Sequence, residues 1–271
     1  MIDPGNLIHP DLSQVAGDDG YGPVIGWAGE QEKGVEFELH GHWRAQLFHI
    51  VSGSVTVETE RGSFVVPPER ALWIPSNVLH GVRYHQRSAL RYLFFRPEAV
   101  LHLTPHPSVI RLSPLVRELI VALLSYPRSE AATAGPAGRI AEVILDQLAT
   151  EPLAPLHLPM PSSTRLRRAV SELAADPARE DGLADVARRA ALSERSFERH
   201  FRSETGLSFR AWRRQARLMK AVEWLSLGAA VGEVADRLGY EEPSAFVAGF
   251  RKAFGVTPGR YFADGDGQLS S

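Results

Sequence analysis

The first part of the chain alternates apolar and polar residues with a period of two, as strands with one buried face do. Segments of this kind, or short apolar runs, lie at 35–40, 55–60, 63–66, 71–74, 81–84 and 90–95. Turn and breaker residues divide them, including Arg61-Gly62 and Pro67-Pro68. Many short strands separated by turns predict an antiparallel barrel or sandwich.

The period becomes helical after Pro97. Apolar residues three and four apart predict two helices, at 112–126 and 139–148. Four prolines among the twelve residues 151–162 exclude a helix and predict a stiff linker between domains. Beyond it, amphipathic segments predict helices at 163–175, 183–190, 194–204, 208–226, 231–238, 243–254 and 258–262.

These elements predict a two-domain α+β protein, with an N-terminal antiparallel β-barrel plus helical pair and a C-terminal all-α domain. The expected parts are the barrel at 1–106, a helical pair for packing or dimerisation at 107–150, the Pro-rich linker at 151–162, the helical domain at 163–265 and a tail at 266–271.

Two stretches of the helical domain share one design, in which a short helix, a turn and a second helix follow each other. Ser193 is a good N-cap for the helix 194–204, and Gly206 ends it. Pro243 and Gly255 bound the equivalent helix of the second stretch. This is the helix-turn-helix arrangement, which places its second helix in the major groove of double-stranded DNA.

The first recognition helix has two distinct faces. Phe197 and Phe201 face inward, and the opposite face carries three arginines and Glu198. Arginine reads guanine or holds phosphate and glutamate accepts from cytosine, although a solvated charged face is the alternative. The second helix is less polar, so we expect phosphate contacts from Arg251 and Lys252 and less base specificity. The candidate DNA-binding residues are Ser193, Arg195, Ser196, Glu198, Arg199, Arg202, Ser244, Val247, Ala248, Arg251 and Lys252.

Charge supports this division of the chain. Residues 1–160 hold 12 basic and 17 acidic residues, whereas the remainder holds 18 and 15, so the basic part coincides with the helix-turn-helix stretches. The absence of cysteine excludes disulfides and thiolate metal sites. Without a long apolar run or a secretory signal, we expect a cytoplasmic protein with no membrane partner.

Histidines concentrate in the predicted barrel. His40 and His42 face the same side of a strand, and His80 can join them from a neighbouring strand. With Gln46 they are candidate ligands of a divalent metal, although glutamine is a poorer ligand than a carboxylate. The same four residues and Trp73 are the candidate effector pocket, and the alternative is that they only fill the barrel.

The helical domain resembles the AraC/XylS family of bacterial transcription regulators. The matching residues are Ser193, Phe197, Arg199, Phe201, Gly206, Arg217, Leu218, Ala221, Glu233, Val234, Ala235, Gly239, Tyr240, Ser244, Phe246, Phe250, Gly255, Thr257, Pro258 and Tyr261. The resemblance implies two helix-turn-helix units, bridged by the helix 208–226, in successive major grooves. Ala248 departs from the family, which usually carries Arg there.

The barrel resembles cupins through the pattern His40-x-His42-x3-Gln46-x6-Gly53 and Pro75-x-Asn77-x2-His80. Cupins carry Glu at the position of Gln46 and usually Gly at that of Asn77. Together the resemblances imply a transcription regulator, not an enzyme, that senses a small-molecule effector in the barrel. We expect a homodimer that binds promoter or operator DNA, with RNA polymerase as a further partner if it activates.

Two alternatives stay open at this point. The first is a metal-dependent cupin enzyme with an appended helical domain, although the missing carboxylate ligand and the helix-turn-helix pattern argue against it. The second keeps the regulator but makes a divalent metal in the barrel its signal. A metal is the single cofactor that the histidine pattern suggests.

Overall fold

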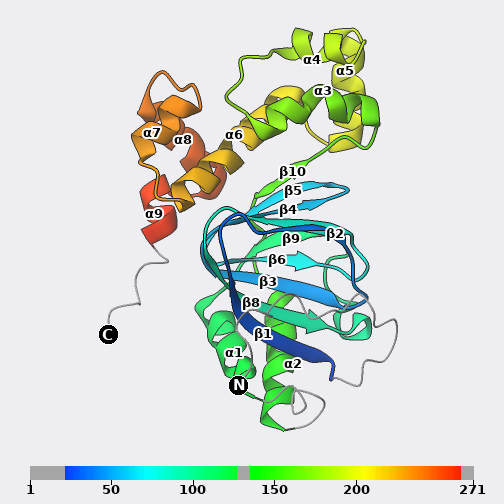
Figure 1. The fold of residues 1–271 in the computed structure, drawn as a ribbon, viewed down its shortest axis with the longest axis vertical. Coiled ribbons are helices and arrows are strands. Elements are labelled where there is room, and N and C mark those ends of the chain that lie inside the picture. The colour runs from blue at the N-terminus through cyan, green and yellow to red at the C-terminus, as the bar shows by residue number, and fades with distance from the viewer. Residues whose placement is uncertain (1–21, 127–134, 264–271) are drawn as a thin grey trace. The chain divides into compact units, whose positions relative to one another are not determined.

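The computed structural model describes residues 22–126 and 135–263, which form two compact units (Figure 1). The first unit holds residues 22–57, 66–126 and 135–154. The second holds 58–65 together with 155–263. The predicted two-domain α+β fold is confirmed. One boundary differs, because the segment 58–65 lies in the predicted barrel sequence but belongs to the unit of the helical domain.

Five antiparallel strands form the larger sheet of the first unit, in the order β1-β8-β3-β6-β9. They are β1 (Val24–Gln31), β3 (Ala45–Ser52), β6 (Arg70–Ile74), β8 (Ser88–Phe95) and β9 (Ser108–Arg111). β2 (Glu36–His40) pairs with β7 (His80–Tyr84). β4 (Val55–Thr59) and β5 (Gly62–Val66) form a hairpin whose tip lies in the second unit. β1 and β9 are strands that the alternating pattern did not indicate.

The register of the larger sheet decides which face each side chain occupies. Leu47 pairs with Trp73 and with Leu93, and all three belong to the core beneath the helices. Their neighbours point to the other face, because side chains alternate along a strand. Phe48 therefore points toward β7, where its ring lies 6.4 Å from that of Tyr84.

Two helices cover the outer face of this sheet, α1 (Pro114–Leu124) and α2 (Pro136–Leu148) (Figure 1). Ser113 caps α1, since its hydroxyl accepts from the backbone N–H of Val116. Val116, Ile120 and Ile144 are buried in the same core as the sheet side chains. Burial of one such side chain stabilises the unit by about 1.5–3 kcal/mol.

The second unit consists mainly of helices, and each helix predicted for it is present with similar bounds. They are α3 (Thr164–Ala175), α4 (Leu183–Arg189), α5 (Glu194–Thr205), α6 (Phe209–Ser226), α7 (Val231–Arg237), α8 (Pro243–Phe254) and α9 (Pro258–Ala263). Among the described residues, none of the helices combines the length and the apolar character that crossing a bilayer requires.

Part of the Pro-rich segment forms a strand. β10 (His157–Pro159) pairs antiparallel with β5, and the ring of His157 stacks on Phe64 with 4.3 Å between the centroids. The indole N–H of Trp212, on α6, donates to the carbonyl of Pro159 over 2.7 Å. Residues 155–162 of the segment predicted as a linker therefore belong to the second unit, held by a strand pairing and by side-chain hydrogen bonds, whereas residues 151–154 belong to the first unit.

Candidate functional site

The first helix-turn-helix consists of α4 and α5. The turn between them needs one residue with positive φ, and Ala191 adopts it at φ 46°. The backbone N–H of Leu192 returns to the carbonyl of Ala187 over 2.9 Å, which closes the turn. Ser193 then caps α5 by accepting from the backbone N–H of Ser196. Gly206 ends the helix in the left-handed conformation at φ 76°.

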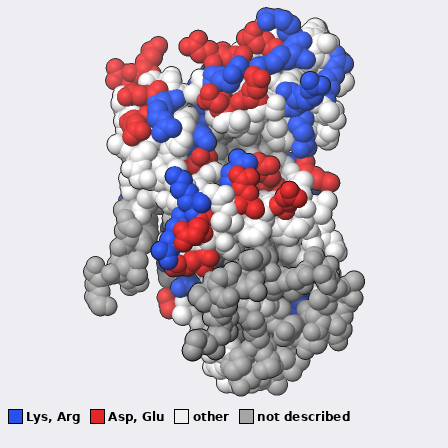
Figure 2. Space-filling model, in the orientation of Figure 1, with Lys and Arg blue, Asp and Glu red and all other residues white. Residues whose placement is uncertain are grey.

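The two predicted faces of α5 are present. Phe197 and Phe201 are fully buried and lie against the rings of Phe209 and Trp212 on α6. On the other side, three arginines are exposed, and none of them forms an ion pair with another described residue. These are Arg195, Arg199 and Arg202. Figure 2 shows basic side chains gathered over the α3–α5 part of the second unit. Unneutralised guanidinium groups on an exposed helix face are suited to phosphate and to base edges.

Glu198 lies on the same helix but its carboxylate is already engaged. Both of its oxygens lie 3.3 Å from the backbone N–H of Phe209, the first residue of α6. Ser208 caps the same helix end through its hydroxyl. A carboxylate at a helix N-terminus satisfies a free N–H and favours the helix dipole. The geometry therefore places Glu198 between the recognition helix and α6.

Glu204 makes the equivalent contact at the other end of α5, and no pattern in the sequence indicated this contact. Its carboxylate accepts from the backbone N–H of Ser163, over 2.8 Å, and from the hydroxyl of Ser162. Burial raises the pKa of Glu204, but these hydrogen bonds outweigh it and hold the pKa below its ordinary value. The partners are 41 residues apart, so no local pattern could have paired them.

The second helix-turn-helix consists of α7 and α8. Gly239, at φ 73°, makes its turn, and the backbone N–H of Tyr240 donates to the carbonyl of Ala235 over 3.0 Å. Phe246 and Phe250 are fully buried, as predicted. The opposite face of α8 forms a shallow open hollow, lined by Ser244, Val247, Ala248, Arg251, Lys252, Gly255 and Thr257. All five residues predicted for this helix thus meet on one surface.

α6 connects the two motifs. Its 18 residues span about 27 Å at 1.5 Å per residue, a length of the same order as one turn of B-DNA. The helix contacts α5 near its start and α7 near its end. Arg213 and Arg217 hold the loop before α4, since they donate to the carbonyls of Asp181 and Pro177. The two recognition helices are therefore presented on one continuous scaffold.

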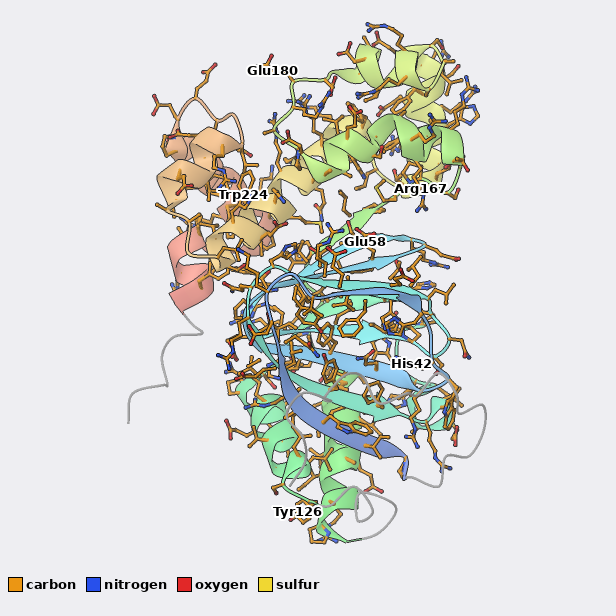
Figure 3. All side chains as sticks on the ribbon, viewed as in Figure 1. His42, Glu58, Tyr126, Arg167, Glu180 and Trp224 are labelled. Carbon is orange, nitrogen blue, oxygen red and sulfur yellow. The ribbon has the colours of Figure 1, made fainter. Side chains whose placement is uncertain are left out.

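In the first unit, the predicted histidines do come together. The ring centroids of His40 and His80 lie 4.5 Å apart, and that of His42 lies 5.2 Å from His80. Figure 3 labels His42 within the first unit. The Nε2 atom of His42 lies 3.1 Å from the side-chain amide of Gln46. Nearby aromatic rings, such as Phe94 at 5.4 Å from His42, fill the space beside them.

In each of these rings, the Nδ1 atom is within hydrogen-bond distance of a backbone carbonyl oxygen two residues away. The distances are 2.8 Å for His40 to Glu38, 2.6 Å for His42 to Arg44 and 2.9 Å for His80 to Val78. Burial lowers the pKa of His42, so this ring is neutral at pH 7 and donates through Nδ1. Among the described residues, no three His, Cys, Asp or Glu side chains are arranged to hold a metal ion.

Trp73 does not join the histidines. It pairs with Leu47, whereas Gln46 pairs with Ile74, so Trp73 and Gln46 lie on opposite faces of the sheet. Its indole N–H donates to the carbonyl of Thr104 over 2.9 Å, on the side covered by α2. Strand order and register decide on which face of the sheet Trp73 lies, and neither can be predicted from the residue pattern alone.

Comparison with known proteins agrees with this architecture. Residues 29–180 match the AraC-like ligand binding domain family, and residues 186–264 match a helix-turn-helix domain family. The HTH-type transcriptional regulator NimR of Escherichia coli is 38% identical over 226 residues, which are 83% of this chain and 82% of NimR. The HTH-type transcriptional activator RhaR of Pectobacterium atrosepticum is 39% identical over 71 residues, covering 26% of this chain and 25% of RhaR.

Solved structures are similar in outline only. ToxT from Vibrio cholerae covers 89% of this chain and 98% of its own, at 9% identity and a TM-score of 0.38. The DNA-binding domain of AdpA, solved in complex with a target DNA, covers 38% of this chain and 93% of its own, at 32% identity and a TM-score of 0.36.

A ligand-binding barrel joined to two helix-turn-helix motifs defines a DNA-binding regulator of transcription. The family match extends over more than half of the chain, and NimR is aligned over most of both proteins. The chain belongs to the AraC family of transcription regulators and carries a ligand-binding domain. NimR and RhaR are both transcriptional regulators.

Proposed function

We propose that this regulator binds operator DNA through both helix-turn-helix motifs and that a small-molecule effector in the first unit changes this binding. One observation carries the proposal. On both recognition helices, most of the predicted DNA-binding side chains lie opposite a buried pair of phenylalanines and face solvent, and Glu198, which contacts Phe209, is the exception. α5 carries three exposed arginines that form no ion pair with the described residues. α8 carries a shallow hollow lined in part by two basic side chains.

The two helices have different roles in this proposal. The arginines of α5 can form bidentate contacts with guanine, so α5 supplies most of the base specificity. On α8, Arg251 and Lys252 hold phosphates, while the small side chains of Ser244 and Ala248 allow close approach of the DNA. Glu198 supports the recognition helix from its contact with Phe209 rather than by reading a base.

We further propose that the protein acts as a homodimer in the cytoplasm, where bacterial promoter DNA lies. The paired helices α1 and α2 leave apolar side chains exposed, with Leu115 at 52%, Val121 at 41% and Val143 at 40%. A second copy would cover them, and two copies would place four helix-turn-helix motifs on one operator. RNA polymerase is a further partner if the regulator activates transcription.

The proposal is tested first by footprinting the purified protein on the intergenic DNA upstream of its own gene. We expect a protected region of about 20 bp per subunit, because two recognition helices occupy successive major grooves. The logarithm of the association constant should fall linearly with the logarithm of the salt concentration, and each contacted phosphate should add about 0.9 to the steepness of this slope. If genomic fragments show no specific protection either with or without cell extract as an effector source, operator binding is disproved.

The role of α5 is tested by Arg199→Ala. Loss of a bidentate base contact should weaken operator binding by about 1–3 kcal/mol and leave binding to unrelated DNA much less affected. Arg83→Ala is the matched control, because Arg83 is exposed in the first unit, where it pairs with Glu36. An Arg199→Ala protein that is folded and binds its operator as tightly as the wild type would contradict this role.

A further inference from the structure

The described part of the first unit contains a pocket that lies on the helix-covered side of the larger sheet, away from His40, His42 and His80. The exposed His102 is among the residues that line it. Its volume is about 200 Å3. Trp73 of β6, Ile110 of β9 and Leu148 at the end of α2 form its walls, and the chain after α2 closes it with Glu151 and Leu153. All of these residues belong to the same compact unit.

The pocket wall is mostly apolar and aromatic. Trp73, Ile110 and Leu148 are 3%, 5% and 6% exposed, so their positions are set by the surrounding core. The indole N–H of Trp73 is occupied by the carbonyl of Thr104. Trp73 therefore offers a guest its ring and not its donor. Such a wall favours a planar apolar group, because aromatic pairs and apolar burial both stabilise the contact.

Glu151 gives the pocket its electrostatic character. One carboxylate oxygen accepts from the backbone N–H of Ser113 over 3.0 Å, which fixes the group at the start of α1. In the described structure, no Lys, Arg or His side chain forms an ion pair with it. It is also the one acidic residue among those lining the pocket. A fixed carboxylate on an apolar wall favours a cation that brings its own hydrogen-bond donors.

We propose that this pocket binds a small aromatic cation, whose ring lies against Trp73 and whose charged head pairs with Glu151. An apolar cavity of about 150 Å3 accepts benzene, so this one accommodates a single ring with a short amino or amidino substituent. The inference rests on the proposed function of the first unit as a sensor, and it identifies the chemical class of the effector. It also places the effector outside the histidine cluster.

The pocket is lined in part by residues that lie just before the chain enters the second unit. The backbone N–H of Arg111 donates to Pro152 over 3.1 Å, and that of Ala154 donates to Val109 over 2.7 Å. Leu153, which lines the pocket, thus sits on the edge of β9. The second unit begins at the next residue after Ala154, so a guest contacts the last residues before the chain leaves the first unit.

Isothermal titration of the full-length protein with benzamidine tests the proposal, with benzamide as the uncharged probe of equal shape. We expect one saturable site and about tenfold preference for benzamidine, which corresponds to one charge-assisted contact. Glu151→Gln should remove the preference, because the amide still accepts from Ser113 but carries no charge. Leu148→Trp should abolish binding of both probes by filling the pocket.

His42→Ala is the matched control and should bind benzamidine as the wild type does, because His42 lies in the other cluster. Absence of saturable binding, a preference that survives Glu151→Gln, or a loss of binding in His42→Ala would each overturn the proposal. Should Leu148→Trp fail to fold, Glu151→Gln decides alone. Operator footprinting on the same preparation separates the two hypotheses, since benzamidine binding does not require DNA binding.

Discussion

Two glutamates on α5, Glu198 and Glu204, hold the starts of two other helices. Glu198 accepts from the first backbone N–H of α6, and Glu204 accepts from Ser163, which precedes α3. These N–H groups have no partner within their own helices, so a carboxylate from elsewhere stabilises each helix end. At the scale of single residues, the orientation of the recognition helix therefore depends on charges that do not face DNA.

Replacing Glu198 distinguishes this positioning role from base reading. Glu198→Ala should lower the free energy of unfolding by about 1 kcal/mol, as loss of a helix-end contact does. It should also weaken binding to all operator sequences alike. Glu198→Gln keeps a hydrogen-bond acceptor, so it should retain most of the stability and most of the operator affinity. The measurements are urea unfolding and binding to operators mutated one base pair at a time. Relaxed preference at a single base pair would instead show that Glu198 reads that base.

His49 is a buried ionisable residue that plays no part in the proposed binding. It is 1% exposed on β3, and neither ring nitrogen has a hydrogen-bond partner in the described structure. Burial, followed by the positive charges of Arg91 and Arg117, lowers its pKa to about 3. Between about pH 3 and pH 6.5, the ring is therefore neutral in the folded protein but charged in the unfolded chain.

This makes stability depend on pH in a predictable direction. Below pH 6.5 the unfolded chain binds a proton at His49 that the folded protein does not, so stability falls as pH falls. The loss approaches about 1.4 kcal/mol for each pH unit below 6. Urea unfolding at pH 7, 6 and 5 gives the slope of the free energy of unfolding against pH. In His49→Leu this slope should be smaller by the contribution of one proton, which is about 1.4 kcal/mol per pH unit. An unchanged slope in His49→Leu would refute the assignment.

At the scale of elements, the tip of the β4–β5 hairpin belongs with the helices of the second unit. The side chain of Arg167, on α3, donates to the carbonyl of Glu60 over 2.7 Å, and Gln215 of α6 donates to the carbonyls of Pro155 and His157. The chain thus passes between the units after residues 57, 65 and 154.

Gly62 is the residue on which this pairing depends. It has φ 137°, and a Cβ at this position would lie 2.1 Å from the carbonyl oxygen of Leu158 on β10. Gly62→Ala should therefore destabilise the second unit by about 1–3 kcal/mol, through backbone strain and loss of the β5–β10 pairing. Gly232→Ala is the matched control, because Gly232 lies within α7 with open space around it. The free energy of unfolding of this control should rise by up to about 1 kcal/mol, because alanine favours a helix more than glycine does.

Denaturant unfolding of the two glycine variants decides the point. A Gly62→Ala protein as stable as the wild type would mean that β10 can leave β5 without cost. Hydrogen exchange at Leu158 offers a second readout, because the backbone groups of β10 are protected only while the strand is paired.

At the scale of the whole molecule, the homodimer proposed above predicts a higher operator affinity through effective concentration. Once one subunit is bound, the second binds as if at millimolar concentration, which raises affinity by about 10²–10⁴-fold without new contacts. The candidate surface is the exposed apolar part of α1 and α2, because a cluster of uncovered apolar side chains marks an association surface.

The double variant Leu115→Glu and Val143→Glu tests that surface. It should sediment as a monomer and lose about 10²-fold or more in operator affinity. Leu39→Glu is the matched control, since Leu39 is 60% exposed on β2 of the same unit and should leave both properties unchanged. Sedimentation velocity and operator titration give the two readouts. If the double variant remains a dimer, the interface lies elsewhere.

Signals contained in a few neighbouring residues were enough to predict both helix-turn-helix motifs. Ser193 and Gly206 bound α5, and Gly255 bounds α8, because capping depends on the conformation of one or two residues. The buried phenylalanines of both helices follow from their spacing of four. The sequence also predicted that His40 and His42 come together, but the assumed geometry was wrong. β2 ends at His40, so His42 lies in the segment after the strand and not on its face.

Contacts between distant segments were not predictable in this way. Glu198 meets Phe209 across a turn, and the pairing of β10 with β5 joins segments about ninety residues apart in the chain. The face on which Trp73 lies depends on register, because a shift by one residue moves every side chain of a strand to the other face.

By itself, the sequence determined the order of the helices, the faces of the two recognition helices and the family. These depend on periodicity and caps, which act over one or two turns of the chain. The tertiary structure alone decided that Glu198 holds a helix end, that Trp73 faces the helices and that a pocket forms beside Glu151. Such features arise where register and packing bring together residues whose spacing in the chain carries no information about their contact.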